Sequence, residues 1–550
     1  MPKNRYKTTF PYDHSRVVLN VCPDNDYINA NYIKDVEGKR RYIATQGPRK
    51  NTIQDFWAMI WQENIRVIVM VTKLTEGSTI KCEQYWPGQG DQMTSGQFCL
   101  QLMSQKDYAN YTQRDINIAN KKTKVVKTVN QFQFTAWPDH GTPSPIELLV
   151  FYRHVMRLMQ MYPDSLLVVH CSAGIGRTGT FIALDALYKH GLKEGNIDVV
   201  EYVKIMREDR MNMIQNAGQY VFLYKALYEI FKTNGRLLKK EQFIQEVTSQ
   251  LMSDKAANAS QFKKEFNELL SIRPVLDEKD TKDARQNIDL NMTKTVLPAD
   301  SIRVLLTSYA RGRGNYYNAV PISSYTLRDG LIAAQYPVEG AAVDLVRLLI
   351  DQECTILISI NQLSDVATSA EWLTTSAEKS VITPYKTMLN TGRSLSNKLK
   401  MTFLKMKHDK DSEWHTVKVL EILNWKINEK LPAEEDVFVE LMNKVQEIIK
   451  DPETKITVLS RDGATGCGIF CAVYNAIQQL QQDNEVDMFT IVRQLQMRRP
   501  EMVSSMSEYQ CCCRVVANFF TAHKDDIYEN AQGQQGVTKT DENIYANTNS

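Results

Sequence analysis

Long apolar stretches are absent from this chain of 550 residues. A membrane-spanning helix needs roughly 18 or more uninterrupted apolar residues. The nearest approach, "DLVRLLIDQECTILISI" at 344–360, carries four charged residues, so it predicts a buried helix followed by a buried strand. The first ten residues, "MPKNRYKTTF", lack the apolar region of a secretory signal peptide. We therefore expect neither a membrane span nor a signal peptide in this chain.

An excess of charge of one sign is also absent. The 66 Lys and Arg residues are balanced by 64 Asp and Glu residues, which gives a net charge of +2. This balance favours neither nucleic acid nor a membrane surface as a partner. The hydrophobic content of 43% and the charged content of 24% are typical of soluble globular domains.

The 10 cysteines lack the CxxC and Cys/His spacings of metal sites, and three of them are consecutive at 511–513. This pattern predicts reduced, mostly buried thiols in a cytosolic compartment. No metal and no other cofactor is predicted.

The chain does contain an internal repeat. The pairs Gln46/Gln335, Asn29/Asn318 and Cys171/Ser460 are each 289 positions apart, and similar short segments surround each pair. The repeat predicts two homologous domains at 1–235 and 236–523, joined near the polar segment 232–243, and a tail at 524–550.

Each copy predicts a mixed α/β fold of the α+β type. Continuous apolar runs at 65–72 and 166–170 alternate with a helical pattern at 144–162, whereas 121–137 alternates polar and apolar residues as antiparallel strands do. We expect a twisted mixed sheet flanked by helices on both faces. The second copy has an amphipathic pattern at 260–272, before its repeat begins, and the first copy is expected to lack this N-terminal helical region.

The segment "HCSAGIGRTG" follows an apolar strand and precedes an apolar helix. Its Cys171 and Arg177 form a Cys-x5-Arg pattern, in which small residues let backbone N–H groups face inward around an anion. The helix N-terminus and the planar guanidinium of Arg177 add to this field, which suits a dianionic phosphoryl group. The same field favours the thiolate of Cys171, a nucleophile toward phosphorus, and Thr178 can offer a hydroxyl to the departing thiolate.

Two other interpretations of this segment stay open on the residues alone. The letters "GIGRTG" at 174–179 match the dinucleotide-binding pattern GxGxxG, and Asp198 and Glu201 follow about 20 residues later. That pattern normally lies in the first strand–helix unit of its domain, whereas this one lies deep in the first copy. The second interpretation is a structural, buried cysteine in a glycine-rich turn.

The segment "VHCSAGIGRTG" resembles the signature loop of the protein-tyrosine phosphatase family without a gap. The tandem layout resembles the cytoplasmic region of receptor-type members, and the resemblance covers residues 1–523. It implies hydrolysis of phosphotyrosine in proteins through a cysteinyl-phosphate, without a metal. It also implies a cytoplasmic location, as the intracellular part of a single-pass plasma-membrane receptor.

The resemblance assigns roles to further residues of the first copy. Asp139 in "WPD" would be the general acid, Gln215 and Gln219 would position water, and Tyr6 in "KNRY" would stack on the phosphotyrosine ring. Glu76 would brace Arg177, Lys81 would contact Asp139, and His170 would support the thiolate. The phosphate loop would comprise Ser172, Ala173, Gly174, Ile175, Gly176 and Arg177. Thr8 departs from the family pattern, which has Asn or Asp two residues after the tyrosine.

The second copy lacks the chemistry of the first. Its equivalents of the nucleophile, phosphate-binding arginine, histidine, acid, water-positioning glutamine and aromatic gate are Ser460, Gly466, Leu459, Ile427, Ser504 and Thr293. The loop glycines Gly463 and Gly468 remain. We therefore expect a catalytically silent domain that serves stability, docking or regulation.

The tail at 524–550 is rich in polar residues and is predicted to be disordered. Tyr528 and Tyr545 each follow acidic residues and have Asn two positions later. If phosphorylated, each resembles a ligand for Src-homology adaptor domains, the alternative being a solvated tail without a partner. A different function class is a scaffold: two phosphatase-like domains with a docking tail and no turnover.

Overall fold

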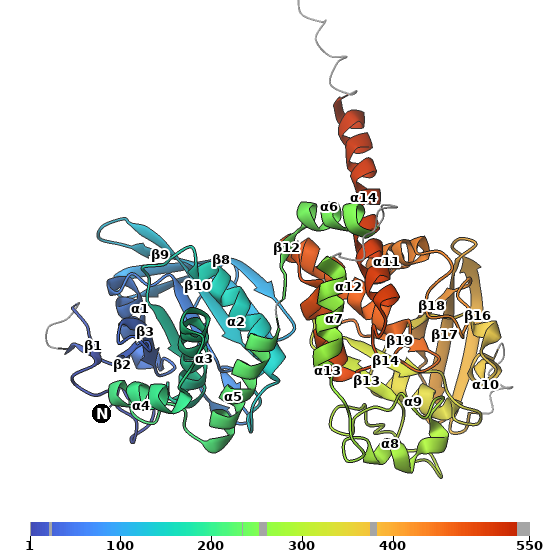
Figure 1. Ribbon diagram of the computed structural model, residues 1–550, viewed down its shortest axis with the longest axis horizontal. Coiled ribbons are helices and arrows are strands. Elements are labelled where there is room, and N and C mark those ends of the chain that lie inside the picture. Colours follow the sequence, from blue (N-terminus) through green and yellow to red (C-terminus); the bar gives the residue numbers. More distant parts are fainter. Residues whose placement is uncertain (1, 21–24, 234, 252–260, 375–381, 536–550) are drawn as a thin grey trace, which may run out of the picture. The chain divides into compact units, whose positions relative to one another are not determined.

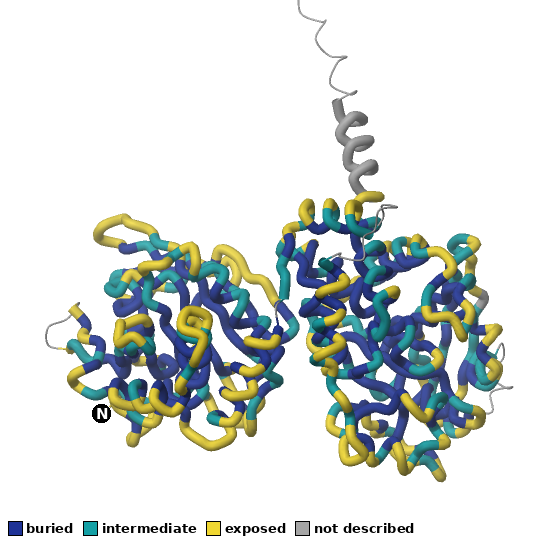
Figure 2. The backbone as a smooth tube through the Cα atoms, viewed as in Figure 1, coloured by how far each residue is buried: buried dark blue, intermediate teal, exposed yellow. Residues whose placement is uncertain are grey.

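The computed structural model describes residues 2–20, 25–233, 235–251, 261–374 and 382–535. The chain divides into two compact units, Met1–Asn234 and Gly235–Ser550, one residue before the boundary that the sequence predicts. Figure 2 shows that buried residues run through the interior of each unit.

The first unit is built on a nine-stranded sheet in the order β1-β2-β3-β11-β4-β10-β9-β8-β7 (Figure 1). The central strands β3, β11, β4 and β10 are mutually parallel, and the outer pairs are antiparallel. The strands are β1 (Arg16–Val18), β2 (Tyr27–Lys34), β3 (Arg40–Thr45), β4 (Val67–Met70), β7 (Gln92–Ser95), β8 (Phe98–Asp107), β9 (Tyr111–Asn120), β10 (Val126–Phe134) and β11 (Leu167–His170). The expected mixed sheet is confirmed. The strand within 121–137, β10, is antiparallel to β9 and parallel to β4, so it lies where the antiparallel part of the sheet meets the parallel part.

Helices cover both faces of this sheet. The buried Phe56 and Trp57 of α1 pack in one cluster with Ile68 of the sheet, whereas α2 and α3 contact strands from the other face. Helices α4 and α5 begin at side-chain caps, where Asp198 accepts from the backbone N–H of Glu201 and Asn216 accepts from that of Gln219. The helices are η2 (Lys50–Thr52), α1 (Ile53–Gln62), α2 (Pro145–Met159), α3 (Gly176–Glu194), α4 (Val199–Asp209) and α5 (Ala217–Lys232), and a small hairpin pairs β5 (Thr75–Glu76) with β6 (Thr79–Ile80).

The second unit repeats this plan in a seven-stranded sheet, in the order β13-β14-β19-β15-β18-β17-β16. Its strands are β13 (Ala319–Ile322), β14 (Leu331–Gln335), β15 (Ile356–Ser359), β16 (Tyr385–Ser394), β17 (Leu399–His408), β18 (His415–Ile422) and β19 (Ile456–Ser460), and β12 (Leu238–Lys239) pairs separately with β20 (Glu485–Val486). Strand β19 occupies the same central place as β11, so the repeat seen in the sequence is also a repeat of topology.

The helices of the second unit include the segments that the sequence predicts. The amphipathic pattern at 260–272 forms α7, and the apolar run at 344–360 forms α9 followed by β15. The helices are α6 (Lys240–Leu251), α7 (Gln261–Ile272), α8 (Lys282–Gln286), η3 (Ile288–Leu290), α9 (Ala342–Asp351), η4 (Leu363–Asp365), α10 (Ser369–Trp372), α11 (Asp436–Ile448), α12 (Cys467–Asp483), α13 (Met488–Arg498) and α14 (Met506–Gln535). None of the helices in the described ranges is long and apolar enough to cross a membrane.

Helix α14 differs from expectation at its end. It continues to Gln535, so 524–535 is helical rather than irregular. A polar composition excludes a packed core, but Lys, Glu, Ala and Gln are good helix formers and no proline interrupts this segment. Tyr528 falls on this part of the helix backbone, whereas Tyr545 lies outside the described residues.

Candidate active site

The Cys-x5-Arg loop spans the gap between β11 and α3, at the carboxyl end of a central parallel strand. Gly174 adopts φ +71°, and a Cβ at this position would lie 2.2 Å from the carbonyl oxygen of Thr45. Only glycine therefore fits the tight turn against the neighbouring strand β3. The sheet thereby places Cys171 beside the N-terminus of α3, where anions bind.

Cys171 lies at the base of the loop and is 5% exposed. Its Sγ accepts the backbone N–H of Gly174 at 3.3 Å. In the part of the chain that the structure describes, the N–H groups of Ile175 and Gly176 donate to no protein acceptor, and the buried hydroxyl of Thr178 has no hydrogen-bond partner. The loop thus presents unpaired donors around one sulfur atom, which suits an anionic group.

Arg177 is held from two sides. Its guanidinium binds both carboxylate oxygens of the buried Glu76 and donates to the carbonyl oxygen of Pro138 at 3.2 Å. It also lies 5.6 Å from the ring centroid of Trp137. A planar cation fixed in this way can face two oxygens of one phosphoryl group.

The "WPD" segment is anchored by its tryptophan and exposed at its acid. Trp137 is buried and its indole N–H donates to the carbonyl oxygen of Gly141 at 3.3 Å, whereas Asp139 is exposed at the rim of the pocket. Lys81 does not contact Asp139 as expected: its Nζ lies 3.9 Å from Glu76. Glu76 is already bound to Arg177, so the lysine joins that ion pair instead of the exposed loop.

Tyr6 is positioned by the segment that precedes it. Arg5 donates to the carbonyl oxygens of Gly47 and Pro48, which pins the segment to the end of β3. The Tyr6 hydroxyl lies 2.9 Å from Oγ of Ser172, and Ser172 in turn donates to the carbonyl oxygen of Lys81 at 2.9 Å. Tyr6 is 37% exposed and lines the pocket, so a ligand there can reach it.

The two predicted glutamines differ in exposure. Gln219 is 8% exposed, and its side-chain oxygen accepts the backbone N–H of Gln215 at 2.9 Å. A Cβ at Gly176 would lie 2.7 Å from this same oxygen, so Gln219 packs directly behind the phosphate loop. Gln215 itself is exposed, which leaves its amide available to a molecule in the pocket.

His170 is fully buried beneath the loop. Burial lowers the pKa of its imidazole to about 4, so the ring is neutral near pH 7. Nδ1 lies 3.2 Å from the carbonyl oxygen of Cys171 and Nε2 lies 2.8 Å from the hydroxyl of Tyr85. A carbonyl only accepts, so Nδ1 carries the proton and Nε2 accepts from Tyr85. His170 therefore holds the backbone of Cys171 and does not reach the pocket.

One pocket of ≈ 400 Å³ collects most of the predicted site residues. Three of them, Gly174, Thr178 and His170, do not line it. Thr8, which the sequence analysis noted only as a departure from the family pattern, also lines it, and Thr9, Thr72, His140, Gly141 and Asn216 line it without having been predicted. Its predicted members are Tyr6, Glu76, Lys81, Asp139, Cys171, Ser172, Ala173, Ile175, Gly176, Arg177, Gln215 and Gln219. Across the described ranges, no group of three or more His, Cys, Asp or Glu side chains could hold a metal ion.

Arg210 supports the loop and escaped the sequence analysis. It is fully buried and donates to the carbonyl oxygens of Gly174 at 2.7 Å and Ala173 at 3.1 Å, and to the side chains of Asn29 and Asn31. Burial lowers the pKa of its guanidinium to about 10. The internal repeat could have identified it, because the equivalent position of the second copy, 289 residues later, is also an arginine, Arg499.

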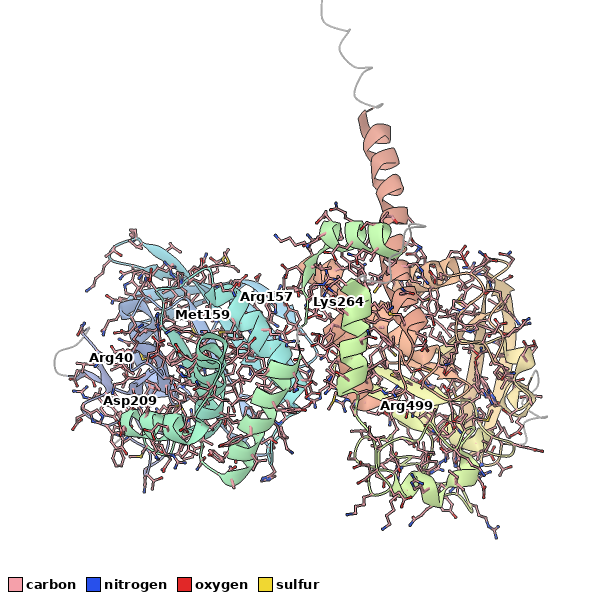
Figure 3. The ribbon with its side chains drawn as sticks, in the orientation of Figure 1. Arg40, Arg157, Met159, Asp209, Lys264 and Arg499 are labelled. Atoms are coloured by element: carbon pink, nitrogen blue, oxygen red, sulfur yellow. The ribbon has the colours of Figure 1, made fainter. Side chains whose placement is uncertain are left out.

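Arg499, labelled in Figure 3, makes the same kind of contact in the second domain. It is buried and donates to the carbonyl oxygen of Asp462 at 3.0 Å and to the side chain of Asn318. Burial lowers the pKa of its guanidinium as well. Both loops thus rest on a buried arginine.

The second loop keeps the turn at Gly463 but differs from the first at Gly466, which has φ +75° and precedes α12, whereas Arg177 lies within α3. Gly463 has φ +70°, and its N–H donates to the hydroxyl of Ser460 at 3.1 Å. At Gly466, which replaces the arginine, a Cβ would lie 2.5 Å from Ile360 and 3.2 Å from Trp425. Ile360 and Trp425 thus pack closely against Gly466, and this backbone has no room for a side chain.

Asp462 also occupies the anion-binding groups of this second loop. Its carboxylate accepts the backbone N–H groups of Ala464 at 2.9 Å and Thr465 at 2.8 Å, and the Thr465 hydroxyl at 2.9 Å. These two N–H groups are the equivalents of the unpaired donors at Ile175 and Gly176. The second loop therefore carries an internal anion where the first presents open donors.

Comparison with known proteins agrees with this geometry. The family described as "Protein-tyrosine phosphatase" matches residues 1–229 and 287–518. Human receptor-type tyrosine-protein phosphatase alpha is 31% identical over 557 residues, covering 95% of this chain and 66% of that protein. Human receptor-type tyrosine-protein phosphatase C is 30% identical over 96% of this chain and 43% of its own length. Tyrosine-protein phosphatase Lar of Drosophila melanogaster is 31% identical over 94% of this chain and 26% of its own length. The chain thus spans less than two thirds of each of these relatives.

Proposed function

Because the chain belongs to the protein-tyrosine phosphatase family, we propose that its first domain hydrolyses phosphotyrosine in proteins through a cysteinyl-phosphate. One observation carries the proposal: the sulfur of Cys171, the fixed guanidinium of Arg177 and the acid Asp139 line a single pocket. The inward N–H groups and the guanidinium can neutralise the charge of a phosphoryl group, which is the main requirement for catalysing its transfer.

In the first step the thiolate of Cys171 attacks phosphorus, so that an S–P bond forms as the bond to the phenolic oxygen breaks. Asp139 gives its proton to the leaving phenolate, so the peptide leaves with a neutral tyrosine side chain. Arg177, held by Glu76, faces the phosphoryl oxygens through this transfer. Its fixed position avoids reorganisation as charge develops.

In the second step water attacks the phosphorus of the cysteinyl-phosphate. Gln215, which is exposed to the pocket, orients this water, and Asp139 takes its proton. The S–P bond breaks, inorganic phosphate leaves and the thiolate returns. Thr178 is buried with an unpartnered hydroxyl among the described residues, so it can donate to the departing sulfur.

The substrate class follows from the gate at Tyr6. Its ring stands at the mouth of the pocket, and Cys171 lies buried at the base. A phosphorylated tyrosine is long enough to reach the sulfur while its ring stacks on Tyr6, whereas phosphoserine is shorter. The partners of the first domain would accordingly be phosphotyrosine-containing proteins.

The second domain is proposed to have no turnover and a structural or regulatory role. Ser460 replaces the nucleophile and Asp462 fills the loop. Cys467 cannot replace the lost cysteine, because burial raises the pKa of its thiol to about 12. Its Sγ donates instead to the hydroxyl of Ser460 at 3.2 Å.

Two further features are proposed on the strength of the relatives and the tail sequence. The relatives are named receptor-type phosphatases, which supports a place for this chain in the intracellular part of a single-pass plasma-membrane receptor. Phosphorylated Tyr528 and Tyr545 would bind Src-homology adaptor domains. Pull-down with singly and doubly phosphorylated tail peptides tests this, and no capture by any of them would contradict it.

The decisive experiment measures phosphate release from p-nitrophenyl phosphate and a phosphotyrosine peptide, in the presence of a chelator. Wild-type turnover should disappear in Cys171→Ser and persist in Ser460→Ala, which removes the equivalent side chain of the second loop. A well-folded wild-type chain without turnover would instead support the scaffold. Activity that persists in Cys171→Ser would contradict the mechanism.

A further inference from the structure

A buried arginine of the first domain lies on β9 and does not line the active-site pocket. Arg114 is 8% exposed, and its guanidinium carbon lies 4.5 Å from the ring centroid of Trp86. Its Nη1 donates to the side-chain oxygens of Gln131 and Gln133, at 2.9 Å in each case. These two glutamines share one face of the neighbouring strand β10. Burial lowers the pKa of the guanidinium, so a cation at this place is costly to the fold.

The first of these glutamines begins a chain of hydrogen bonds that ends at the nucleophile. The amide nitrogen of Gln131 donates to the hydroxyl of Tyr85 at 2.8 Å, and this hydroxyl donates its own proton to Nε2 of His170. Nδ1 of His170 then donates to the carbonyl oxygen of Cys171. Every proton of the chain points from the cation toward Cys171, and hydrogen bonds aligned in this way polarise and strengthen one another. The guanidinium fixes the direction, because it has donors only.

The second glutamine leads to the arginine that is proposed to bind phosphate. The amide nitrogen of Gln133 donates to the carbonyl oxygen of Thr72 at 3.2 Å. The hydroxyl of Thr72 donates to the carboxylate of Glu76 at 3.1 Å, and Glu76 in turn binds Arg177. One guanidinium outside the pocket is therefore connected to both the nucleophile and the phosphate-binding arginine inside it.

The second domain has the same strands without this network. Equivalent positions follow from the strand pairing, because β10 pairs with β4 and β9 as β18 pairs with β15 and β17. By contrast, Arg210 behind the first loop has an equivalent arginine, Arg499, behind the second. The sheet therefore folds without the network, and the copy that lacks the nucleophile lacks the network as well. The residues equivalent to Arg114, Gln131 and His170 are Thr402, Val419 and Leu459, all of them buried.

We propose that Arg114 is a positioning residue for the phosphatase reaction, because it connects the nucleophile and the phosphate-binding guanidinium through one glutamine each. This inference rests on the proposed function of the first domain. A network that served the sheet alone would be expected in both copies, as the arginine behind each loop is. A displacement of about 1 Å in an active site can cost roughly 100-fold in rate, so a contact that fixes two reacting groups at once contributes to catalysis.

The test uses the full chain and the variant Gln131→Val, which introduces the valine of the second domain. In this variant Arg114 keeps the side-chain oxygens of Gln133 and Gln105, and Tyr85 keeps the imidazole beneath the loop, so the domain should fold. For p-nitrophenyl phosphate and a phosphotyrosine peptide, kcat should fall about 10–100-fold. KM should stay within about twofold, because the groups that bind the phosphoryl oxygens are unchanged.

The matched control is Gln101→Val, the same substitution at an exposed position of β8. It should leave kcat unchanged, and urea unfolding of both variants measures the stability of the sheet. Equal losses of kcat in the two variants would attribute the effect to the sheet and overturn the proposal. An unchanged kcat in Gln131→Val, or a loss confined to KM, would also overturn it.

Variants of the arginine itself test the connection between the two branches. Arg114→Leu should lower kcat and also raise KM, because it removes the support of both groups. Arg114→Lys keeps a cationic donor and should retain more activity than Arg114→Leu. Adding Gln131→Val to Arg114→Leu should reduce kcat less than Gln131→Val does alone, because both residues act in one chain. Additive losses would show that Arg114 does not act through Gln131.

A readout without turnover separates this proposal from the proposed function. Gln131→Val should shift the nitrogen-15 resonance of His170 Nε2, because the hydroxyl of Tyr85 becomes a weaker donor, and it should slow the alkylation of Cys171 by iodoacetamide. Gln101→Val should change neither. A folded wild-type chain without turnover would contradict the proposed function alone. An alkylation rate that is the same in Gln131→Val and wild type would then contradict the positioning role.

Discussion

The loops at 171–177 and 460–466 share a turn and its buried support, but they differ in the groups that could bind an anion. Gly174 and Gly463 have φ values of +71° and +70°, and a buried arginine donates to the carbonyl oxygens of each loop. In the first loop the donors face an open pocket. In the second, Asp462 accepts the two equivalent N–H groups, and Gly466, which replaces the arginine, packs against Ile360.

This difference separates what holds the loop from what the loop does. The supporting contacts are buried, and removing one leaves buried polar atoms unpaired, which is costly in either domain. The groups that face the pocket carry chemistry only, so they can change without loss of the fold. In the second domain the loop N–H groups of Ala464 and Thr465 donate to a carboxylate of the loop itself, that of Asp462.

The largest predicted effect is on Arg177. Arg177→Ala removes the planar cation and leaves Glu76 facing the pocket, so kcat/KM for a phosphotyrosine peptide should fall roughly 10³–10⁵-fold. The matched control is Arg461→Ala, an exposed arginine of the second loop that binds Asn428, and it should leave the rate unchanged. A loss below tenfold in Arg177→Ala would show that Arg177 does not carry the phosphoryl charge.

Local sequence supplied most of the architecture and the reactive centre. The continuous apolar runs predicted the central parallel strands, and the amphipathic pattern at 260–272 predicted α7. The short segment around Cys171 and Arg177 predicted a loop between a strand and a helix, because its residue types restrict the backbone. The repeat then showed which residue of the second copy replaces each predicted site residue of the first.

What the sequence missed depends on contacts between distant segments. Arg210 lies 36 positions from Gly174, and nothing in its immediate neighbours marks it as buried. Lys81 was expected to bind Asp139, but the fold brings it to Glu76. The role of Asp462 was missed because a polar residue in a glycine-rich turn is ordinary, and only the structure shows which N–H groups it accepts.

The second prediction concerns acid stability and His170. Burial lowers its pKa from 6.5 to about 4. Between these two pH values the imidazole is protonated in the unfolded chain but neutral in the native domain. Stability of the first domain should therefore be unaffected by this group above pH 6.5 and fall as pH drops from 6.5 toward 4. The free energy of unfolding of this domain should fall by about 3 kcal/mol over that range.

The second domain offers the comparison, since Leu459 stands at the equivalent position and does not titrate. Urea unfolding, followed by hydrogen exchange in peptides of each central sheet, should be measured at pH 7 and pH 4.5. His170→Leu should reduce the pH dependence of the first domain and leave that of the second unchanged. An identical pH dependence in wild type and His170→Leu would refute the burial of a neutral imidazole.

The third prediction moves the internal anion into the active loop. Ala173 is the equivalent of Asp462, so Ala173→Asp should place a carboxylate on the N–H groups of Ile175 and Gly176. Substrate must then displace it, and KM should rise about 10–100-fold while kcat changes little. Ala173→Asn, which has the same shape without the charge, should raise KM less. Equal effects of the two would attribute the change to size and not to charge.

The smallest predicted effect is the reverse change. Asp462→Ala removes three hydrogen bonds from the second loop and should lower the free energy of unfolding of that domain by about 1–2 kcal/mol. Added sulfate should restore part of this stability in Asp462→Ala but have less effect on wild type, because only the variant has unpaired N–H groups there. Hydrogen exchange of peptides containing 462–468 measures both effects, and equal protection by sulfate in the two chains would show that Asp462 does not act as the internal anion of the second loop.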